Sequence, residues 1–295
     1  FLDAADLMSP AGELLIIKPT PSLGPLDNPL KGYCLYTTAG KIHRPYSMVF
    51  QYASWKELEP LEGRYAFEDW EKRKWSHPRA SGKHVVFRVY VDYPGKPLGL
   101  PDWLRAKGVT EKNYRAHGGG KSPDYNHPQM VQALERLITA MGKRYNTHPR
   151  VAFIQLGLLG FWGEWHTYPR GELFASEPTQ HRIIRAYLKA FPNKQLMARY
   201  ADGVLSQYHT IGFHDDMFPE DTDNGKDWSF LARMRRGGHI DNWKKNVVGG
   251  EMVPNAAAKW MGNQWAITKE MVKRSHFSWV GPYSPALDAK VSVDL

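Results

Sequence analysis

Short apolar runs alternate with longer periodic segments along most of the chain. The apolar runs are rich in β-branched and aromatic residues and end at Gly, Pro or Asp, which is typical of buried strands; they cover residues 30–36, 48–52, 85–91, 151–156, 195–200, 210–213, 246–248 and 277–280. Between many of them the apolar spacing is helical, most clearly at residues 67–81, 128–145, 178–190 and 256–274. Eight strands alternating with helices predict an α/β fold, the (β/α)8 TIM barrel.

Two of the connections are short for this fold. Residues 37–45 and 201–208 leave little room for a helix, so we expect reduced helices after strands 1 and 5. The alternative is a doubly wound sheet, but no Gly-rich phosphate loop follows an early strand. Residues 1–28 are predicted to be an N-terminal lead-in with one possible edge strand at 13–18, and residues 29–295 to be the barrel domain.

The composition is that of a folded domain. The chain has 295 residues, of which 42% are apolar and 23% charged, and no apolar run approaches the roughly 18 residues of a membrane span. The only cysteine is Cys34, which excludes an internal disulfide, and we expect it to be buried and inert. Because the first residue is Phe1, we expect a mature or trimmed chain that is secreted or periplasmic. The oligomeric state is not indicated.

The net charge is +9, from 39 basic and 30 acidic residues. The basic residues are scattered, with their densest clusters at 72–74 and 233–236, and neither cluster belongs to a nucleic-acid motif, so we expect no nucleic-acid partner. An acidic glycan fits the charge as well as a solvated surface does. Aromatic residues make up 13% of the chain, and their flat faces with polar rims suit sugar rings.

Two predicted strands end close to a glutamate. Glu164 follows the fourth strand between Trp162 and Trp165, and Glu251 follows the seventh strand after two glycines. In this barrel the active site lies at the carboxyl ends of the strands. A carboxyl group beside two tryptophans is partly desolvated, which suits a general acid, and two carboxyl groups across a groove are the machinery of glycoside hydrolysis. The alternative for each glutamate alone is a structural ion pair.

Two segments resemble the clan A glycoside hydrolases, a large group of (β/α)8 enzymes. Residues 55–67, WKELEPLEGRYAF, are similar to the strand-two motif W-x-x-L-E-P-x-x-G-x-Y-x-F of that clan, and residues 155–166, QLGLLGFWGEWH, to a poorly characterised group of bacterial glycosidase-like barrels, a domain of unknown function. The resemblance covers residues 29–283. It implies Glu164 as acid/base and Glu251 as nucleophile. One departure is Gly163, which stands where the clan usually has an Asn that binds the sugar 2-hydroxyl.

Further polar and aromatic residues are expected at the same mouth. An arginine there could bind an anionic substituent on the sugar or form an ion pair in the barrel core. Asp215 or Asp216 is the alternative second carboxylate. Only His214 and Asp216 share a strand face, and no third ligand follows, so we expect no metal and no cofactor. The expected substrate-binding residues are Arg88, Asp92, Trp162, Trp165, His166, Arg199, Tyr200, His214, Asp216, Trp279 and Tyr283.

These patterns predict a glycoside hydrolase that cleaves a polysaccharide or oligosaccharide with retention of configuration. The net positive charge favours an acidic or sulfated glycan as the substrate. An inverting enzyme would use the same residues with a wider gap. The alternative from another class is a barrel that binds glycans without cleaving them, in a polysaccharide-processing system. The barrel fold alone does not decide between them.

Overall fold

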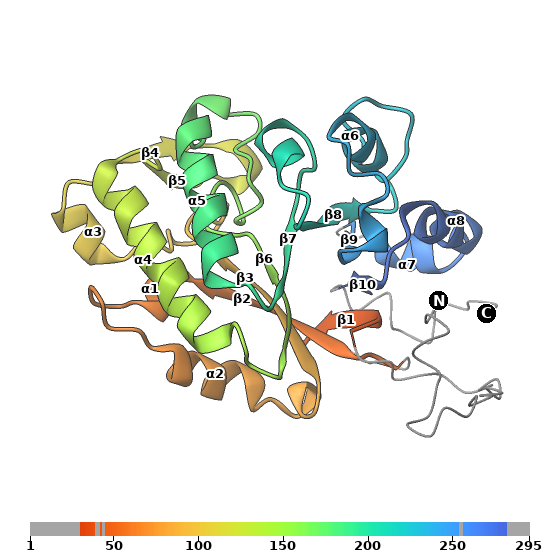
Figure 1. Ribbon diagram of the computed structural model, residues 1–295, viewed down its shortest axis with the longest axis horizontal. Helices are drawn as coiled ribbons and strands as arrows, with labels where there is room; N and C mark the ends of the chain where they lie inside the picture. The colour runs from red at the N-terminus through yellow and green to blue at the C-terminus, as the bar shows by residue number, and fades with distance from the viewer. Residues whose placement is uncertain (1–29, 39–41, 43–44, 254–255, 282–295) are drawn as a thin grey trace, which may run out of the picture.

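The computed structural model describes residues 30–38, 42, 45–253 and 256–281, so the predicted lead-in at residues 1–28 and Tyr283 lie outside the described residues. Eight parallel strands close into a barrel in the order β1-β10-β9-β8-β7-β6-β3-β2 (Figure 1). The barrel strands are β1 Gly32–Tyr36, β2 Met48–Ser54, β3 His84–Tyr90, β6 Val151–Gln155, β7 Gln195–Ala198, β8 Gly212–Phe218, β9 Val248–Met252 and β10 Trp279–Gly281. The predicted (β/α)8 barrel is confirmed.

Helices surround the barrel, and α4 and α5 lie side by side along one flank (Figure 1). The α-helices are α1 Trp55–Leu58, α2 Phe67–Trp75, α3 Asp102–Ala106, α4 Pro128–Tyr145, α5 Glu177–Ala190, α6 Phe230–Arg236, α7 Ala257–Met261 and α8 Trp265–Ser275. Short 3-10 helices are η2 Pro78–Ala80, η3 Ala116–Gly118, η4 Gly171–Leu173, η5 Gly203–Gln207 and η6 Asn242–Lys244. A hairpin of β4 Glu111–Tyr114 and β5 Gly120–Pro123 is inserted after the third barrel strand.

The sequence predicted most of these elements but not all their ends. The helix after the fifth strand is reduced to η5, as expected, and none is present among the described residues of the first connection. The single helix predicted at 256–274 is wrong, because the chain breaks at Gly262 into α7 and α8. Helix α6 and the β4–β5 hairpin were not predicted.

The barrel interior has an apolar lower part and a polar upper part. An interior cluster contains Phe50, Val86, Phe153 and Met197, whereas the neighbouring Phe87 faces outward onto Trp70 of α2. Side chains alternate along a strand, so the residue two positions further also faces inward. Those residues are Tyr52, Arg88, Gln155 and Arg199. The barrel interior therefore changes from apolar to polar over two residues along each of these strands, in the direction of their carboxyl ends.

Strands β3 and β6 approach closely at Gly157, directly after β6. A Cβ atom on Gly157 would lie 2.1 Å from the carbonyl oxygen of Val89. We expect Gly157→Ala to lower the free energy of unfolding by about 1–3 kcal/mol, because backbone must move to admit the methyl group. Gly171→Ala is the matched control: its Cβ meets open space, so the change should stay within about 0.5 kcal/mol. Urea unfolding measures both, and equal stabilities would refute the close approach.

Candidate active site

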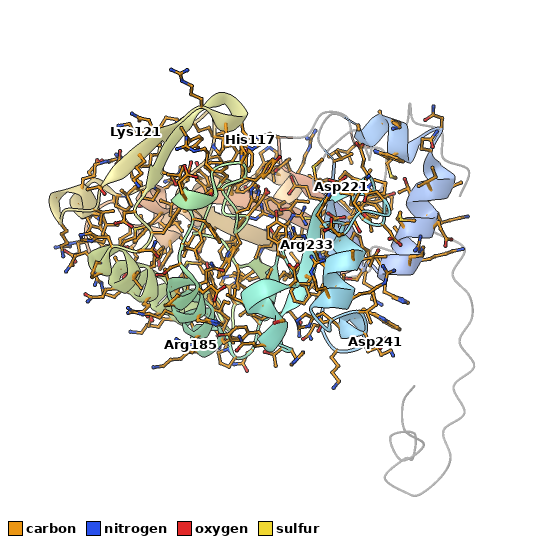
Figure 2. The ribbon with its side chains drawn as sticks, turned by 90° about the horizontal axis from the view of Figure 1, so that it is seen from above. His117, Lys121, Arg185, Asp221, Arg233 and Asp241 are labelled. Carbon is orange, nitrogen blue, oxygen red and sulfur yellow. The ribbon has the colours of Figure 1, made fainter. Side chains whose placement is uncertain are left out.

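One large cavity opens at the carboxyl ends of the barrel strands. Its volume is about 1340 Å³, more than the roughly 300–1,000 Å³ of a typical small-molecule pocket. It is bounded by strand ends, by the segment after β6, by η5 and by the segment between β8 and α6. Figure 2, which views the molecule from above, shows His117 near the β4–β5 hairpin and Asp221 and Arg233 on the later part of the chain.

Beneath the cavity lies Arg88, a fully buried side chain of β3. Its Nε donates to Gln155 Oε1 at 2.7 Å, and its Nη1 donates to the Tyr52 hydroxyl at 3.1 Å. The same Nη1 lies 2.8 Å from Glu164 Oε1, and Nη2 lies 2.9 Å from Asp216 Oδ2. One guanidinium group thus joins four strands or strand ends and holds two of the carboxylates predicted to do chemistry.

Asp216 is surrounded by donors. Its Oδ1 accepts from His214 Nδ1 at 2.5 Å, and Arg199 Nε lies 3.7 Å from its Oδ2. Burial alone would raise the pKa of Asp216, but the charges of Arg88 and Arg199 and the contact with His214 outweigh it and hold that pKa well below its ordinary range. Burial lowers the pKa of His214, so its ring is neutral at pH 7, with the proton on Nδ1 facing the carboxylate.

The segment after β6 folds back over the mouth. Leu158, Trp162 and Trp165 all have positive φ, between 54° and 71°, a conformation that is rare for such side chains. Backbone hydrogen bonds hold it, from Trp162 N to Asp92 O and from Trp165 N to Leu159 O. This winding returns Glu164, nine residues beyond the end of β6, to the barrel axis. Backbone conformations of this kind concentrate at functional sites.

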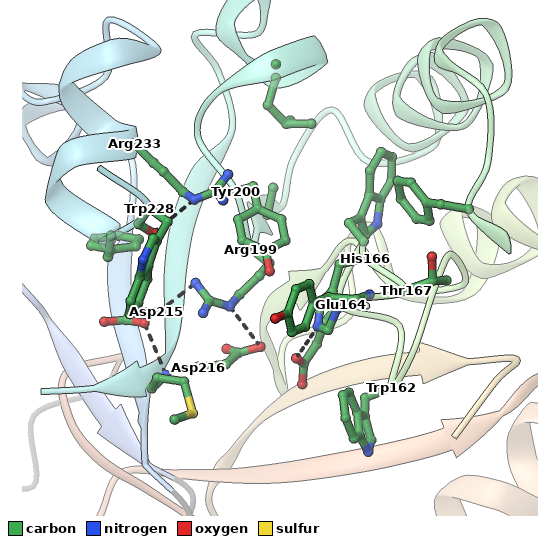
Figure 3. Close-up of a pocket in the computed structure, with 18 of the residues that line it drawn as sticks. Trp162, Glu164, His166, Thr167, Arg199, Tyr200, Asp215, Asp216, Trp228 and Arg233 are labelled. Atoms are coloured by element: carbon green, nitrogen blue, oxygen red, sulfur yellow. Dashed lines mark hydrogen bonds and ion pairs between the residues drawn. The ribbon is translucent and has the colours of Figure 1, made fainter. Parts of the chain in front are cut away.

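His166 directs a donor at Glu164 (Figure 3). The backbone N–H of Tyr168 donates to His166 Nδ1 at 3.2 Å, so Nδ1 is an acceptor and Nε2 carries the N–H that faces Glu164. That Nε2 lies 3.4 Å from Glu164 Oε2, while Arg88 holds the other carboxylate oxygen. The Glu164 side chain is 14% exposed and lines the cavity, so both its oxygens are oriented while the group stays open to a ligand.

Gly163 cannot be exchanged for the Asn of the clan pattern without strain. Its φ is +72°, and a Cβ atom there would lie 2.9 Å from the carbonyl oxygen of Val89. Position 163 therefore cannot supply the contact that the clan's Asn makes, so either another side chain makes it or the chemistry differs. Among the described residues that line the cavity, Tyr93 lies on this side of the mouth, with its ring 6.4 Å from that of Trp162.

Most of the predicted site residues gather at this cavity. Glu251 lies within β9 rather than after it and lines the cavity, 5% exposed. Burial, then the charges of Glu251 and Glu164, raise the pKa of Tyr93, which shows that both carboxylates act on one side chain. The other predicted residues in the lining are Trp162, Trp165, His166, Arg199, Tyr200, Asp215 and Asp216. Arg88 and His214 lie directly beneath it.

Two predicted residues lie elsewhere. Trp279 packs in the apolar cluster of the lower barrel interior with Cys34 and Met48, so it belongs to the core. Asp92 lies beyond the cavity lining, where it accepts a hydrogen bond from the Tyr114 hydroxyl of β4. Burial raises the pKa of Asp92 to about 7, although the Tyr114 hydrogen bond opposes the shift.

The sequence reasoning missed several lining residues. Tyr36 and Tyr52 lie at the ends of the first two strands, and strand alternation from the apolar interior would have identified them. Trp228 comes from the segment between β8 and α6, which carries no periodic signal, and Arg233 comes from α6, which was not predicted. The Arg233 guanidinium lies 4.5 Å from the ring centre of Tyr200, and it is paired with Asp202.

Within the described residues, no three His, Cys, Asp or Glu side chains are grouped so that they could hold a metal ion. No helix in the described ranges is both long and apolar enough to cross a membrane.

No family model and no curated protein matches the chain. Among solved structures, the chain is similar to an exo-beta-1,4-mannosidase, Op5Man5, from Opitutaceae bacterium strain TAV5, with a TM-score of 0.50 and 12% identity over 79% of this chain and 44% of that one. For endo-glycoceramidase II from Rhodococcus sp., the TM-score is 0.47 and the identity 17%, over 80% of this chain and 64% of that one. For a family 39 glycoside hydrolase from Bacteroides cellulosilyticus WH2, the TM-score is 0.49 and the identity 13%, over 88% of this chain and 58% of that one.

The chain thus spans less than two thirds of the length of each of these three proteins. At 12% identity the likeness to the mannosidase is one of fold. The predicted resemblance to the barrels of glycoside hydrolases is confirmed at that level, since the closed barrel of eight parallel strands is present.

Removing the Arg88 charge leaves two carboxylates without their buried partner. We expect Arg88→Met to lower the free energy of unfolding by about 3–5 kcal/mol. The loss should be largest near pH 7. As the pH falls below 3.8, the ordinary Asp pKa, Asp216 becomes protonated in the unfolded state, and the stability that wild type gains from keeping Asp216 ionised in the folded state decreases. The difference between wild type and variant should therefore shrink. Urea unfolding at pH 7 and pH 3 measures this.

Arg170→Met serves as the control for Arg88→Met. Arg170 pairs with Glu172 on the surface, where both side chains are at least 40% exposed, so we expect a change of less than about 1 kcal/mol. Similar losses in both variants would contradict the role of Arg88.

The raised pKa of Asp92 predicts a stability that falls with rising pH. The folded state keeps this proton up to about pH 7, whereas the unfolded state releases it near 3.8, so the contribution is full at low pH and is lost as the pH rises through 7. We expect wild type to lose stability relative to Asp92→Asn between pH 5 and pH 8. Melting curves at both pH values test this, with exposed Asp241→Asn as background; parallel behaviour of wild type and Asp92→Asn would argue against it.

Proposed function

We propose that the protein is a glycoside hydrolase that cleaves an oligosaccharide or polysaccharide with retention of configuration. The observation that carries the proposal is that Glu164 and Glu251 line the same cavity at the carboxyl ends of the barrel strands. The barrel is also the fold of the exo-beta-1,4-mannosidase, which agrees with this class of reaction but is by itself a statement about fold.

In this mechanism Glu164 is the acid/base. It gives its proton to the glycosidic oxygen as the bond to the anomeric carbon breaks, and the second carboxylate attacks that carbon to form a glycosyl ester. Glu164 then takes a proton from water as that water attacks the anomeric carbon, which breaks the bond to the ester oxygen and frees the sugar and the carboxylate. The donor on His166 Nε2 orients the Glu164 oxygen that is not bound by Arg88.

Glu251 is the better candidate for the second carboxylate. Asp216 is close enough to be considered: its Oδ2 and Glu164 Oε1 bind the two terminal nitrogens of one guanidinium group, so they lie within roughly 8 Å of each other. However, both oxygens of Asp216 are engaged, one by Arg88 and one by His214. Arg199 lies 3.7 Å from the same carboxylate, so Asp216 is surrounded by three basic side chains and suits the task of fixing Arg88.

The lining favours an uncharged sugar over the acidic or sulfated glycan that the net charge suggests. Six carboxylate side chains line the cavity, against two guanidinium groups; the carboxylates are Glu164, Asp202, Asp215, Asp216, Asp221 and Glu251, and the cations are Arg199 and Arg233. Arg233 is already paired with Asp202 at 2.9 Å. Arg88 and Arg236 pair with three of these carboxylates from outside the lining, but carboxylates still outnumber guanidinium groups, so a sulfate or carboxylate on the substrate would meet more like than opposite charge. A polymeric glycan substrate would fit the secreted or periplasmic location proposed for the chain.

A second candidate is a barrel that binds glycans without cleaving them. The ion pair between Glu164 and the buried Arg88, together with glycine at position 163, supports it, because a structural carboxylate would be held in the same way. Exposed aromatic rings at the mouth, such as Trp228, suit either role.

Kinetics of Glu164→Ala separate these roles. On neutral glycans and on glycosides with poor leaving groups, we expect kcat/KM to fall by about 10²–10⁴-fold, because no acid protonates the leaving oxygen. Glycosides of 2,4-dinitrophenol need no such proton and should lose far less. Azide should then restore turnover and give a glycosyl azide of retained configuration with Glu164→Ala, but of inverted configuration with Glu251→Ala.

The surface variant Glu172→Gln is the control and should match wild type, since Glu172 is exposed and pairs with Arg170 on the surface. Unchanged hydrolysis by Glu164→Ala would falsify its assignment. Saturable binding of a glycan by wild type without release of reducing ends would support the non-catalytic barrel instead.

A further inference from the structure

The cavity has two chemically different parts. Around Glu164 and Asp216 it is charged, as described above. The other part, here called the side pocket, is formed by the segment that continues from Glu164, by the start of α5 and by η5. It consists of Trp165, Thr167, Phe174, Gln180, Ala198, Val204 and Leu205, none of which carries a charge.

The polar groups of the side pocket are already committed to the backbone. The Thr167 hydroxyl donates to Arg170 O at 2.7 Å, and Gln180 Nε2 donates to Ala175 O at 2.7 Å. The indole N–H of Trp165 donates to Gly157 O at 3.2 Å. A sugar ring placed here would give up the water around its hydroxyl groups and meet few donors in return, which is unfavourable. An apolar group would lose nothing of this kind.

The carboxylate next to η5 is already paired with arginines. Asp202 stands at the start of η5, but its carboxylate is paired with Arg233 at 2.9 Å and with Arg236 at 2.5 Å. Two further uncharged residues of the cavity lining, Tyr168 and Pro169, follow Thr167 in the chain, and Tyr168 is 73% exposed.

We infer that the side pocket binds an apolar aglycone, an alkyl or aryl group attached to the sugar on its leaving side. This inference rests on the proposed function. Glu164 protonates the leaving oxygen, and the chain runs from Glu164 directly into Trp165 and Thr167, so the side pocket lies next to the leaving group rather than next to the sugar that forms the ester. Hydrolysis then releases the alcohol, which carries the proton from Glu164.

A chain-length series tests the inference. Methyl, butyl, hexyl and octyl glycosides of whichever neutral sugar responds are compared by kcat/KM, with phenyl glycosides as a separate arm that distinguishes aryl from alkyl groups. We expect kcat/KM to rise about fourfold for each CH₂ that enters the side pocket. In Val204→Thr, which keeps the shape but adds a hydroxyl, the ratio of octyl to methyl kcat/KM should fall about tenfold.

The control is Ile267→Thr, the same kind of replacement at an exposed position on α8, which should leave that ratio unchanged. The melting temperature of Val204→Thr verifies that it folds, since Val204 is only partly buried. A binding measurement does not depend on the sugar: titration with 1-octanol should show saturable binding to wild type, weakened in Val204→Thr and not in Ile267→Thr.

The outcomes separate the two proposals. A flat chain-length series without saturable octanol binding overturns the side-pocket inference, while Glu164-dependent hydrolysis of the methyl glycoside would still support the proposed function. Saturable octanol binding without cleavage of any glycoside supports the side pocket as a binding site for apolar groups and overturns its role in hydrolysis.

Discussion

A buried guanidinium group holds the mouth of this barrel together. Arg88 has no exposed surface, and a charge removed from water in this way is tolerated only where carboxylates and hydrogen-bond acceptors surround it. Its partners come from β2, β6, β8 and the segment after β6, so the cost of burying Arg88 is offset only if all four have their native positions. Stability and the geometry of the candidate site are therefore coupled through one side chain.

This coupling explains why the site begins where the apolar interior ends. Met197, Phe153 and Val86 fill the lower barrel and exclude water, and two positions further along the same strands stand Arg199, Gln155 and Arg88. The barrel interior leaves little room for water, so both arginines are paired with carboxylates there: Arg88 with Glu164 and Asp216, and Arg199 with Asp215. The alternation that the sequence shows thus predicts the polar layer as well as the core, and it would have revealed Tyr52 and Gln155.

The sequence predicted poorly the segments in which polar residues of the candidate site interrupt the hydrophobic pattern. The sixth strand was expected to end at residue 213, but β8 continues to Phe218 through His214, Asp215 and Asp216, because their charges are satisfied inside the barrel. The segment that carries Glu164 depends on positive φ at Trp162 and Trp165, which no propensity predicts. The sequence predicted the eight strands and the clan-like motif. The positions of the carboxylates relative to one another became clear only from the folded barrel.

The charge of the cavity lining differs from the net charge of the chain. The chain carries nine more basic than acidic residues, yet carboxylates outnumber guanidinium groups in the cavity lining. Many of the basic residues are consumed in surface pairs, such as Arg182 with Glu135 and Arg144 with Glu71. A ligand entering the cavity meets the local field, and this field is strongest at the buried floor, where little water screens it. The excess of carboxylates in the cavity lining is thus opposite in sign to the net charge of the chain.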